Sequence, residues 1–457
     1  MRSLAKFVFI GGICVWLANA GLRWAAAPPL GHDEARYATD TRELVHRDGK
    51  RYVYVPVGMN VIAAPGIVMG GSERALRMVP LFAGVLFLFA AWRLAHRVTD
   101  PDSARWVVGV LAGAHPMVRF SADLLSDFAS AACLLAALTI IVEELKDPSH
   151  GPRFRLVGAA PLLAASFYIR YGSCLSIAII ILVSLMAGGR AIARRRMPVV
   201  AMLSLFGMLV IPHVIHSMSE TRSAAGILLL SGSVPGKAGE GLVTYVSGNV
   251  LATYGFVVAP LMIVGVLRGW SDRWLVVLRL IAVAQIIVLG LTTHAQSRFV
   301  FLATALLVVC GVQAARRLRT RTTRLRPALN AMATAAIVAS WAGGLAAGVW
   351  APRARAASYR PTLLASEAIR EDAQGVECEV LGRHTAQLDW YSGCRAVLVV
   401  SDDAIFADAP VYAVRRGSDS WDIKSITAAS CPVFRALGIV EVVRFRDPAR
   451  GCAADRD

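Results

Sequence analysis

The residues best suited to chemistry lie in the stretch 31–38, which reads Gly-His-Asp-Glu-Ala-Arg-Tyr-Ala. Asp33, Arg36 and Tyr37 are three and four positions apart, so they would share one face of a helix. A carboxylate can deprotonate a hydroxyl, paired carboxylates can hold a divalent cation, and an arginine beside a tyrosine can bind a phosphate. The spacing therefore offers a base and a phosphate-binding group on one face, although an amphipathic surface helix would show the same spacing.

The composition is that of a membrane protein. Of the 457 residues, 56% are hydrophobic and 17% are charged, and the mean hydropathy is +0.55. The net charge of +17 could indicate a nucleic-acid-binding protein. However, the lysines and arginines lie in short clusters between apolar runs, as they do in the loops of membrane proteins. We therefore expect the lipid bilayer, and no nucleic acid, as the environment of the chain.

Apolar runs long enough to cross a ~30 Å hydrocarbon core recur along residues 1–352. They predict a polytopic α-helical membrane protein with about eleven transmembrane helices. The runs are 7–22, 76–92, 105–118, 124–142, 156–169, 172–188, 197–216, 242–266, 274–291, 299–315 and 328–350.

The basic clusters predict the orientation of these spans. With the N-terminus inside, alternating the connections places nearly every cluster on one side, as the positive-inside rule requires. The loop at 28–75 then lies outside the cytoplasm, and we expect the chain in the inner (plasma) membrane. The first run could also be a signal peptide, which would leave residue 31 outside as well. The run 156–187 fits two short helices with an outer turn, or one kinked span with a re-entrant piece.

From residue 353 to 457 the pattern changes to short, strand-like stretches between helix-like ones. It predicts a small extracytoplasmic α/β domain. The expected strands are 376–381, 396–400, 411–415 and 439–445, and the expected helices include 385–391 and 431–437.

Four of the eight cysteines lie in this C-terminal segment. An even number of cysteines in an exported domain indicates disulfides rather than free thiols. Sequence locality favours Cys378–Cys394 and Cys431–Cys452, but three connectivities are possible. A zinc site is disfavoured because the segment has no Cys-x-x-Cys spacing.

Residues 33–38 resemble the first-loop motif of the GT-C superfamily of membrane glycosyltransferases, which reads Asp-Glu-x-Arg-Tyr-Ala. The resemblance is to the branch that holds the lipid A aminoarabinose transferase, the rhizobial galacturonosyltransferases and the protein mannosyltransferases. Relatives there carry a Lys-Pro-Pro element after the acidic helix. The matching region 59–65 has no lysine here. The resemblance covers the first two outer loops and the plan of the spans.

The expected topology gathers further polar residues on the outer side. The second outer turn supplies Asp123 and Asp127, spaced i, i+4 at the start of a span, where a helix dipole favours negative charge. The resemblance implies a second acid in this loop, and Asp123 is the expected one. Other outer turns supply Arg170, His294 and Arg298, and also the pair His213 and His216, whose spacing resembles that of metal ligands or simply marks a helix end.

Together these features predict an inverting glycosyltransferase. It would move a sugar from a polyprenyl-phosphate donor to an extracytoplasmic glycolipid, polysaccharide or protein. Asp33 would be the general base, with Glu34 and Asp123 holding a divalent ion or orienting the site. The residues expected to bind the donor or its phosphate are Arg36, Tyr37, Arg170, His294 and Arg298.

Two other classes of function remain open from the sequence. A transporter or lipid flippase would place ionisable groups near the bilayer midplane on broken helices. A non-catalytic scaffold with an exported binding domain would leave the 31–38 motif unexplained. The sequence has no Walker loop, dinucleotide fingerprint or His-Glu-x-x-His motif, so no nucleotide cofactor is expected.

Overall fold

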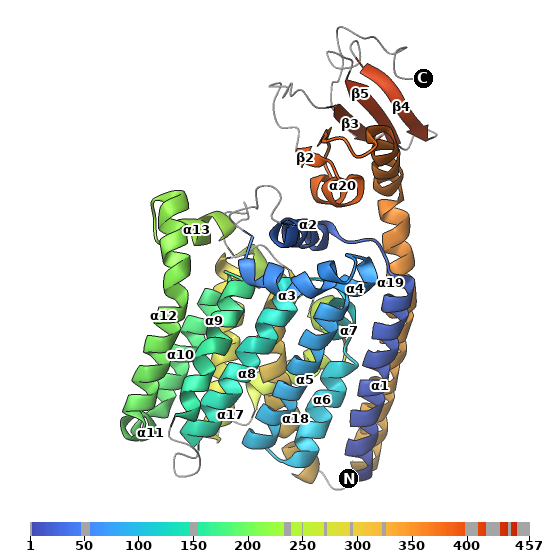
Figure 1. Ribbon diagram of the computed structural model, residues 1–457. Coiled ribbons are helices and arrows are strands. Elements are labelled where there is room, and N and C mark those ends of the chain that lie inside the picture. The colour runs from blue at the N-terminus through green and yellow to red at the C-terminus, as the bar shows by residue number, and fades with distance from the viewer. Residues whose placement is uncertain are drawn as a thin grey trace.

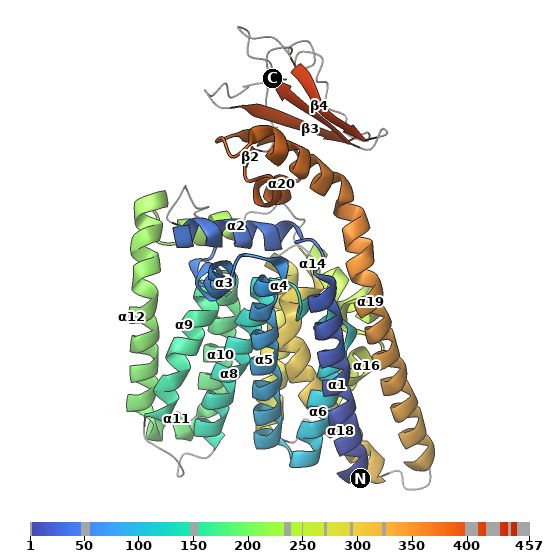
Figure 2. The ribbon, with the colours of Figure 1, turned by 45° about the vertical axis from the view of Figure 1, so that its right-hand side comes forward.

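The computed structural model shows a bundle of long helices with a small sheet beyond one end of the bundle (Figures 1 and 2). It describes residues 2–46, 55–146, 154–232, 239–248, 250–268, 272–292, 296–321, 326–397, 410–416, 430–436 and 440–445.

The first half of the bundle contains α1 (Arg2–Ala26), α5 (Met78–Val98), α6 (Pro101–Ala112), α8 (Ser126–Lys146), α9 (Ala159–Ile169), α10 (Ser173–Gly188) and α12 (Arg196–Thr221). The second half contains α16 (Val258–Leu267), α17 (Arg273–Thr292), α18 (Phe301–Arg321) and α19 (Arg326–Ala373). Shorter helices connect them: α2 (His32–His46), α3 (Val57–Val68), α4 (Glu73–Leu76), α7 (His115–Phe120), α11 (Arg190–Arg194), α13 (Gly226–Gly232), α14 (Glu240–Val243) and α15 (Val250–Tyr254).

Seven helices of the described chain are long and apolar enough to cross a membrane. The expected fold class, a polytopic helical protein with a small C-terminal sheet, is confirmed, while the number of spans stays a prediction. The run 156–187 forms two helices, α9 and α10, on either side of a turn at 170–172, as one of the two readings predicted. The run 242–266 is broken. Its last segment begins after Gly255, whose φ of +83° ends the preceding helix.

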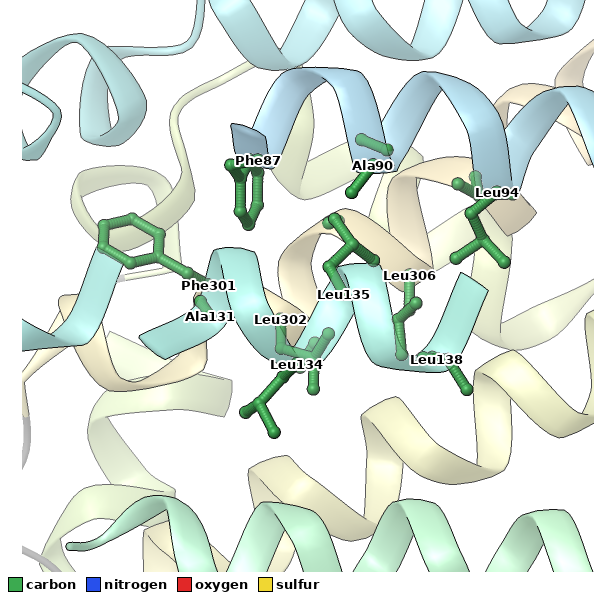
Figure 3. Packing of buried hydrophobic residues seen from close by; sticks show 14 of the residues in the cluster. Phe87, Ala90, Leu94, Ala131, Leu134, Leu135, Leu138, Phe301, Leu302 and Leu306 are labelled. Atoms are coloured by element: carbon green, nitrogen blue, oxygen red, sulfur yellow. The ribbon is translucent and has the colours of Figure 1, made fainter. Parts of the chain in front are cut away.

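The core of the bundle lies between α5, α8 and α18 (Figure 3). Aromatic rings from all three helices meet there. The ring centroids of Phe87 and Phe128 are 5.0 Å apart, and those of Phe128 and Phe301 are 5.3 Å apart in an edge-to-face arrangement. Such pairs each add about 0.5–1.5 kcal/mol beyond the burial of their surface.

Small residues let other helix pairs approach closely. A Cβ on Gly12 of α1 would overlap the backbone of Gly109 on α6, and a Cβ on Gly311 of α18 would overlap the backbone of Leu261 on α16. Close backbone contact matters in a bilayer, where the lipid is as apolar as the helix surface and packing provides much of the association.

The C-terminal part contains a five-stranded sheet in the order β2-β1-β3-β5-β4. The pair β1–β2 and the pair β1–β3 are parallel, and the other two pairs are antiparallel. The elements are β1 (Glu379–Leu381), α20 (Thr385–Ser392), β2 (Arg395–Val397), β3 (Val411–Arg416), β4 (Ser430–Ala436) and β5 (Val440–Phe445).

The sequence predicted a helix at 431–437 and a domain boundary at residue 353 in this part of the chain. The helix expected at 431–437 is wrong, because β4 occupies this stretch and pairs with β5. The expected domain boundary at residue 353 stays a prediction, since α19 runs through it without a break, from the bundle to the sheet (Figure 2). Its last turns pack Ala365 and Ile369 against the sheet residues Val380 and Val442.

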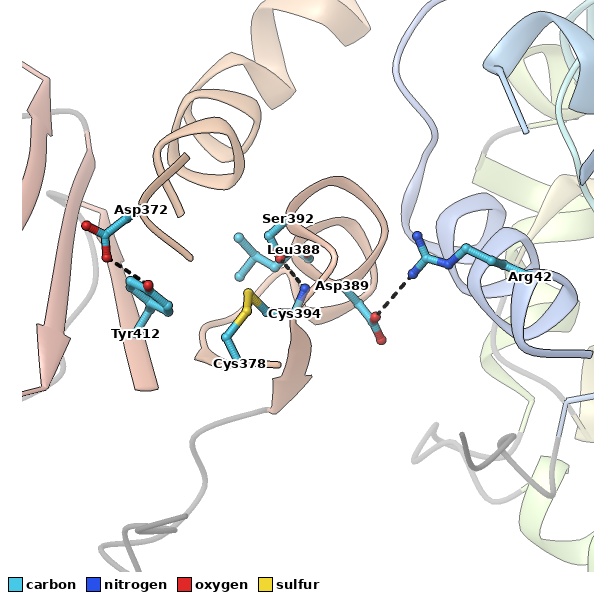
Figure 4. Close-up of a disulfide and its surroundings, with 8 residues drawn as sticks. All are labelled: Arg42, Asp372, Cys378, Leu388, Asp389, Ser392, Cys394 and Tyr412. Atoms are coloured by element: carbon cyan, nitrogen blue, oxygen red, sulfur yellow. Dashed lines mark hydrogen bonds and ion pairs between the residues drawn. A yellow bond between two sulfur atoms is a disulfide. The ribbon is translucent and has the colours of Figure 1, made fainter. Parts of the chain in front are cut away.

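A disulfide joins Cys378 and Cys394, as sequence locality favoured (Figure 4). Cys378 directly precedes β1, and Cys394 directly precedes β2, so the bridge ties together the two ends of the segment that contains α20. Cys431 is also disulfide-bonded. Cys452, its expected partner, lies outside the described residues.

Candidate active site

The predicted acidic helix is α2, which begins at His32 and lies across the end of the bundle that faces the sheet (Figure 1). Glu34 fixes its start. One carboxylate oxygen of Glu34, Oε2, accepts a hydrogen bond from the backbone N–H of Gly31 at 2.8 Å. A glutamate in the first turn that reaches back to the residue before the helix satisfies an otherwise unpaired donor.

Glu34 also belongs to a buried charge cluster that ties five segments of the chain together. Both of its oxygens are bound: Arg77 and the backbone N–H of Leu124 donate to Oε1 at 3.2 and 2.9 Å, and Arg355 donates to Oε2 at 2.6 Å. Asp123 shares the arginines. The members of this cluster are Arg23, Glu34, Arg77, Asp123 and Arg355.

This cluster leaves little room for a metal ion. The side chains of Glu34 and Asp123 are only 2% and 3% exposed, and their oxygens accept hydrogen bonds from guanidinium groups. Among the residues that the structure describes, no three His, Cys, Asp or Glu side chains come together as a ligand set. The two carboxylates do lie near each other, but their donor partners do not fit a cation site, and removing one partner of a buried pair typically costs about 3–5 kcal/mol.

A second, more open group of charges contains Asp33. The guanidinium of Arg298, which lies just before α18, donates to Asp33 Oδ2 at 2.6 Å. The same guanidinium lies 3.3 Å from Asp127 on α8, and Asp127 pairs with Arg170 at 2.6 Å. We name Asp33, Asp127, Arg170 and Arg298 the open charge group.

The open charge group differs from the buried cluster in its access to solvent. The Asp33 side chain is 39% exposed and that of Arg298 is 16% exposed. The ring of Phe299 lies under both arginines, 4.1 Å from Arg170 and 5.7 Å from Arg298. A guanidinium that rests on an aromatic face keeps its edge free for an oxyanion.

Asp123 and Asp127, the two acids near the start of α8, therefore have separate partners. The prediction that Asp123 and Asp127 both lie at the start of one helix is wrong, because α8 begins at Ser126 and Asp123 lies in the turn before it. Asp123 joins the buried cluster, and Asp127 joins the open charge group.

The surroundings of Asp33 shift its titration. Burial alone would raise its pKa, but the guanidinium of Arg298 outweighs burial, and the pKa of Asp33 lies below its ordinary value. Burial, followed by the charge of Arg36, lowers the pKa of His32. At neutral pH, Asp33 is thus ionised and His32 is uncharged.

The other predicted residues of α2 have defined positions. Arg36 lies 3.1 Å from the Nε2 atom of His32. The hydroxyl of Tyr37 lies 2.9 Å from the hydroxyl of Ser126, so it anchors α2 to the start of α8. Burial, aided by the charge of Asp127, raises the pKa of Tyr37 to about 12 and keeps it protonated. His294, also predicted, lies outside the described residues.

Sequence reasoning missed the three arginines of the buried cluster. Arg23, Arg77 and Arg355 all lie at the expected outer ends of spans. An arginine on the outer side runs against the positive-inside rule and so needs another reason for its position. That exception was the available signal. His213, which the sequence offered with His216 as a possible metal ligand, packs its ring against Phe167 and Tyr171.

The C-terminal part contacts α2 through α20. The side chain of Asp389 lies 3.9 Å from Arg42 (Figure 4). The guanidinium of Arg42 also lies 5.1 Å from the ring centroid of Trp390. The hydroxyl of Tyr391 accepts a hydrogen bond from the backbone N–H of Leu30 at 2.8 Å. The helix that carries Asp33 is therefore held from below by the bundle and from above by α20.

This contact is expected to depend on pH through Asp389. Burial raises its pKa to about 7, although Arg42 opposes the shift and Glu43 adds to it. The Asp389 carboxyl binds its proton more tightly when α20 packs against α2 than when the side chain is exposed. The contact between α20 and α2 is therefore most stable below about pH 4 and weakens as pH rises to about 7. Hydrogen exchange of α20, corrected for intrinsic rates, should show decreasing protection over this range. Asp389→Asn should remove the trend, and equal protection of the unmodified protein at pH 5 and pH 8 would contradict the assignment.

Comparisons with known proteins agree with this fold. Residues 55–216 match the family described as dolichyl-phosphate-mannose-protein mannosyltransferase. ArnT from Cupriavidus metallidurans is similar in structure in its apo state, with a TM-score of 0.70, 13% identity, and coverage of 95% of this chain and 98% of that chain. Its form bound to undecaprenyl phosphate gives a TM-score of 0.69 at 13% identity, covering 96% and 97% of the two chains.

A more distant structure shares the same fold. The Archaeoglobus fulgidus oligosaccharyltransferase in complex with Zn and sulfate has a TM-score of 0.55 at 13% identity, covering 84% of this chain and 62% of that chain. No curated protein sequence matches. The match over residues 55–216 and the shared fold confirm the expected resemblance to the GT-C superfamily of membrane glycosyltransferases.

Proposed function

We propose that this protein transfers a sugar from a polyprenyl-phosphate donor to a hydroxyl of an acceptor outside the cytoplasm. The observation that carries the proposal is the 2.6 Å contact between Asp33 and Arg298. It unites the predicted base and the predicted phosphate-binding group, from segments 265 residues apart, at a position that solvent can reach.

The proposed reaction is a single displacement. The acceptor hydroxyl attacks the anomeric carbon of the donor sugar, while the bond from that carbon to the phosphate oxygen breaks and its electron pair stays on the phosphate. Asp33 takes the proton of the attacking hydroxyl. Arg298, supported by Arg170, stabilises the negative charge that grows on the leaving phosphate.

The ion pair explains how donor binding could prepare the base. Without a donor, Arg298 is shared between Asp33 and Asp127. A donor phosphate competes for the guanidinium, because phosphate is also a preferred bidentate partner of arginine. Once Arg298 turns to the phosphate, the carboxylate of Asp33 loses the partner that lowers its pKa and becomes a stronger base.

An apolar groove supports a lipid-linked donor. A cavity of about 330 Å³ lies between α3, α5, α8 and α9, and residues such as Pro65, Phe82, Ala129 and Ile169 line it. Ile169 directly precedes Arg170 of the open charge group. A groove of this size could hold the first isoprene units of a polyprenyl chain, and the similar ArnT has been observed with undecaprenyl phosphate.

The remaining predicted residues take supporting roles in this proposal. Glu34 and Asp123 hold α2 in place through the buried cluster rather than reacting. Arg36 and Tyr37 position His32 and the start of α8 next to Asp33. The transporter alternative loses support, because the charged side chains of the two groups described above gather around α2 at the sheet-facing end of the bundle and not at its centre (Figure 1).

The proposal is tested by sugar transfer with purified protein in proteoliposomes. The donor is a polyprenyl-phosphate sugar labelled in the sugar, and the acceptor is an envelope lipid extract from the source cells. We expect the label to move to extract lipids with release of polyprenyl phosphate. Label that stays on the donor or goes to water alone would contradict a transferase.

The proposed location in the inner membrane has its own test. Ser358 on α19 and Ala193 on the basic helix α11 are both exposed, on the sheet-facing side and at the other end of the bundle respectively (Figure 1). In a variant whose free cysteines Cys14, Cys133, Cys174 and Cys310 are alanine, Ser358→Cys should react with an impermeant thiol reagent in intact spheroplasts, and Ala193→Cys should not. The opposite pattern would place Asp33 on the cytoplasmic side.

A further inference from the structure

Trp390 of α20 packs on the wall of the apolar groove. Its ring lies over the turn between α3 and α4, because a Cβ added to Gly71 would lie 3.8 Å from the tip of the indole and 3.9 Å from the side chain of Ile67. Trp390 also packs against the apolar cluster that contains Ile67. The residues of the groove that belong to the same cluster are Ile62, Val79, Ala83, Ala129, Cys133 and Ile169.

The helices α3 and α4 form a hairpin that makes up one wall of the groove. α3 lies across the end of the bundle, between α2 and the ends of the long helices (Figures 1 and 2). The two helices touch at Gly66, where an added Cβ would lie 3.1 Å from the Cα atom of Leu76. Gly70 and Gly71, with φ values of +103° and +63°, make the turn between them. A residue that holds this turn therefore holds the whole hairpin.

A second contact from α20 reaches the same hairpin. The hydroxyl of Tyr391 donates a hydrogen bond to Glu73, the first residue of α4, and accepts one from the backbone N–H of Leu30. The neighbouring residues Trp390 and Tyr391 thus contact the turn and the helix that follows it. The C-terminal part holds one wall of the groove as well as α2.

The opposite side of the groove is open to the surroundings of the bundle. Its lining residues Met69 and Phe82 are 62% and 69% exposed. In a membrane this opening faces lipid chains, which are as apolar as the groove itself. Burial alone therefore favours neither the groove nor the bilayer, and a chain is held by close packing against the wall. A wall that is free to move forfeits these contacts.

We propose that Trp390 is a positioning residue that fixes the hairpin against the donor chain and so makes the reaction selective for a phosphate that carries isoprene units. The inference rests on the proposed function and deepens it. The bundle supplies the base and the phosphate-binding arginines. The C-terminal part, through α20, sets how tightly the groove holds the lipid chain of the donor.

The test compares Trp390→Ala with Trp350→Ala, a control at a tryptophan of α19 that is 74% exposed. The donors carry the same sugar phosphate on chains of one to four isoprene units, and kcat/KM for transfer to an envelope lipid extract is measured in proteoliposomes. For wild type we expect kcat/KM to rise about 10-fold or more from one unit to four, through packing along the groove. Partitioning of the donor into the bilayer cancels when two variants are compared with the same donors.

Trp390→Ala is expected to lose most of this rise, with kcat/KM for the one-unit donor within about twofold of wild type. Trp390→Phe keeps a ring over the turn and should retain most of the rise. Trp350→Ala should resemble wild type at every chain length. The melting temperature of each variant is measured alongside.

The outcomes separate this inference from the proposed function. A rise with chain length as steep in Trp390→Ala as in wild type would overturn the inference alone. Equal losses at every chain length, with a lower melting temperature, would assign Trp390 a purely structural role and also overturn it. Equal use of all chain lengths by wild type would mean that the groove does not select the chain. If wild type transfers sugar from none of these donors, the proposed function fails, and this inference fails with it.

Discussion

Asp33→Asn is expected to lower the rate of sugar transfer by about 100-fold or more, the order of a lost general base. Asparagine keeps the size of the side chain, so α2 should remain docked between the bundle and α20. The neutral amide cannot accept the proton of the attacking hydroxyl. The measurement is the initial rate of transfer in proteoliposomes, with Asp102→Asn as the matched control, because Asp102 pairs with Arg105 at the other end of the bundle.

The same variant makes a second, less obvious prediction. The carboxylate of Asp33 lies 2.6 Å from the guanidinium of Arg298. It therefore competes with the donor phosphate for this arginine. Removal of this competitor should leave the affinity for polyprenyl phosphate unchanged or increase it, even as turnover is lost. Near wild-type turnover, or a large loss of polyprenyl-phosphate affinity, would remove Asp33 from its proposed role.

Arg298→Ala is expected to impair donor binding and turnover together, with transfer reduced by about 100- to 1,000-fold. The guanidinium would contact the phosphate in the bound donor and more strongly in the transition state, where the charge on the phosphate grows. Arg298→Lys keeps the charge but loses the planar fork, so it should lower turnover more than it weakens binding.

Arg119→Ala is the control for these variants. Arg119 is an exposed arginine at the same end of the bundle, and its guanidinium lies 5.1 Å from the ring of Phe120, not beside a carboxylate of the site. Its loss should leave transfer unchanged. Equal effects of Arg298→Ala and Arg119→Ala would mean that the outer positive charge matters only as a general field, not through a specific contact.

The sequence predicted the features that depend on local pattern. Apolar runs fix the helices of the bundle, and the spacing of Asp33, Arg36 and Tyr37, with a glutamate at the start, is enough to indicate α2. The meeting of Asp33 with Arg298 could be expected only from the alternation of the spans and from the resemblance to a family. Their contact depends on the packing of α2 over the end of α18, which no local pattern encodes.

The errors arose where a partner far along the chain decides the structure. The stretch 431–437 has a helix-like pattern, but β5 pairs with it and makes it a strand. Asp123 looked like a helix-start residue, yet Arg355, 232 residues later, holds it in the turn before α8.

The most direct measurement of the central claim is a comparison of two donors in one assay. Purified wild-type protein in proteoliposomes receives an envelope lipid extract and either a synthetic polyprenyl-phosphate sugar or the nucleotide form of the same sugar, each labelled in the sugar. If the open charge group serves a lipid-linked phosphate beside an apolar groove, label is transferred from the polyprenyl donor and not from the nucleotide donor. Transfer from the nucleotide sugar alone would contradict this account of the site.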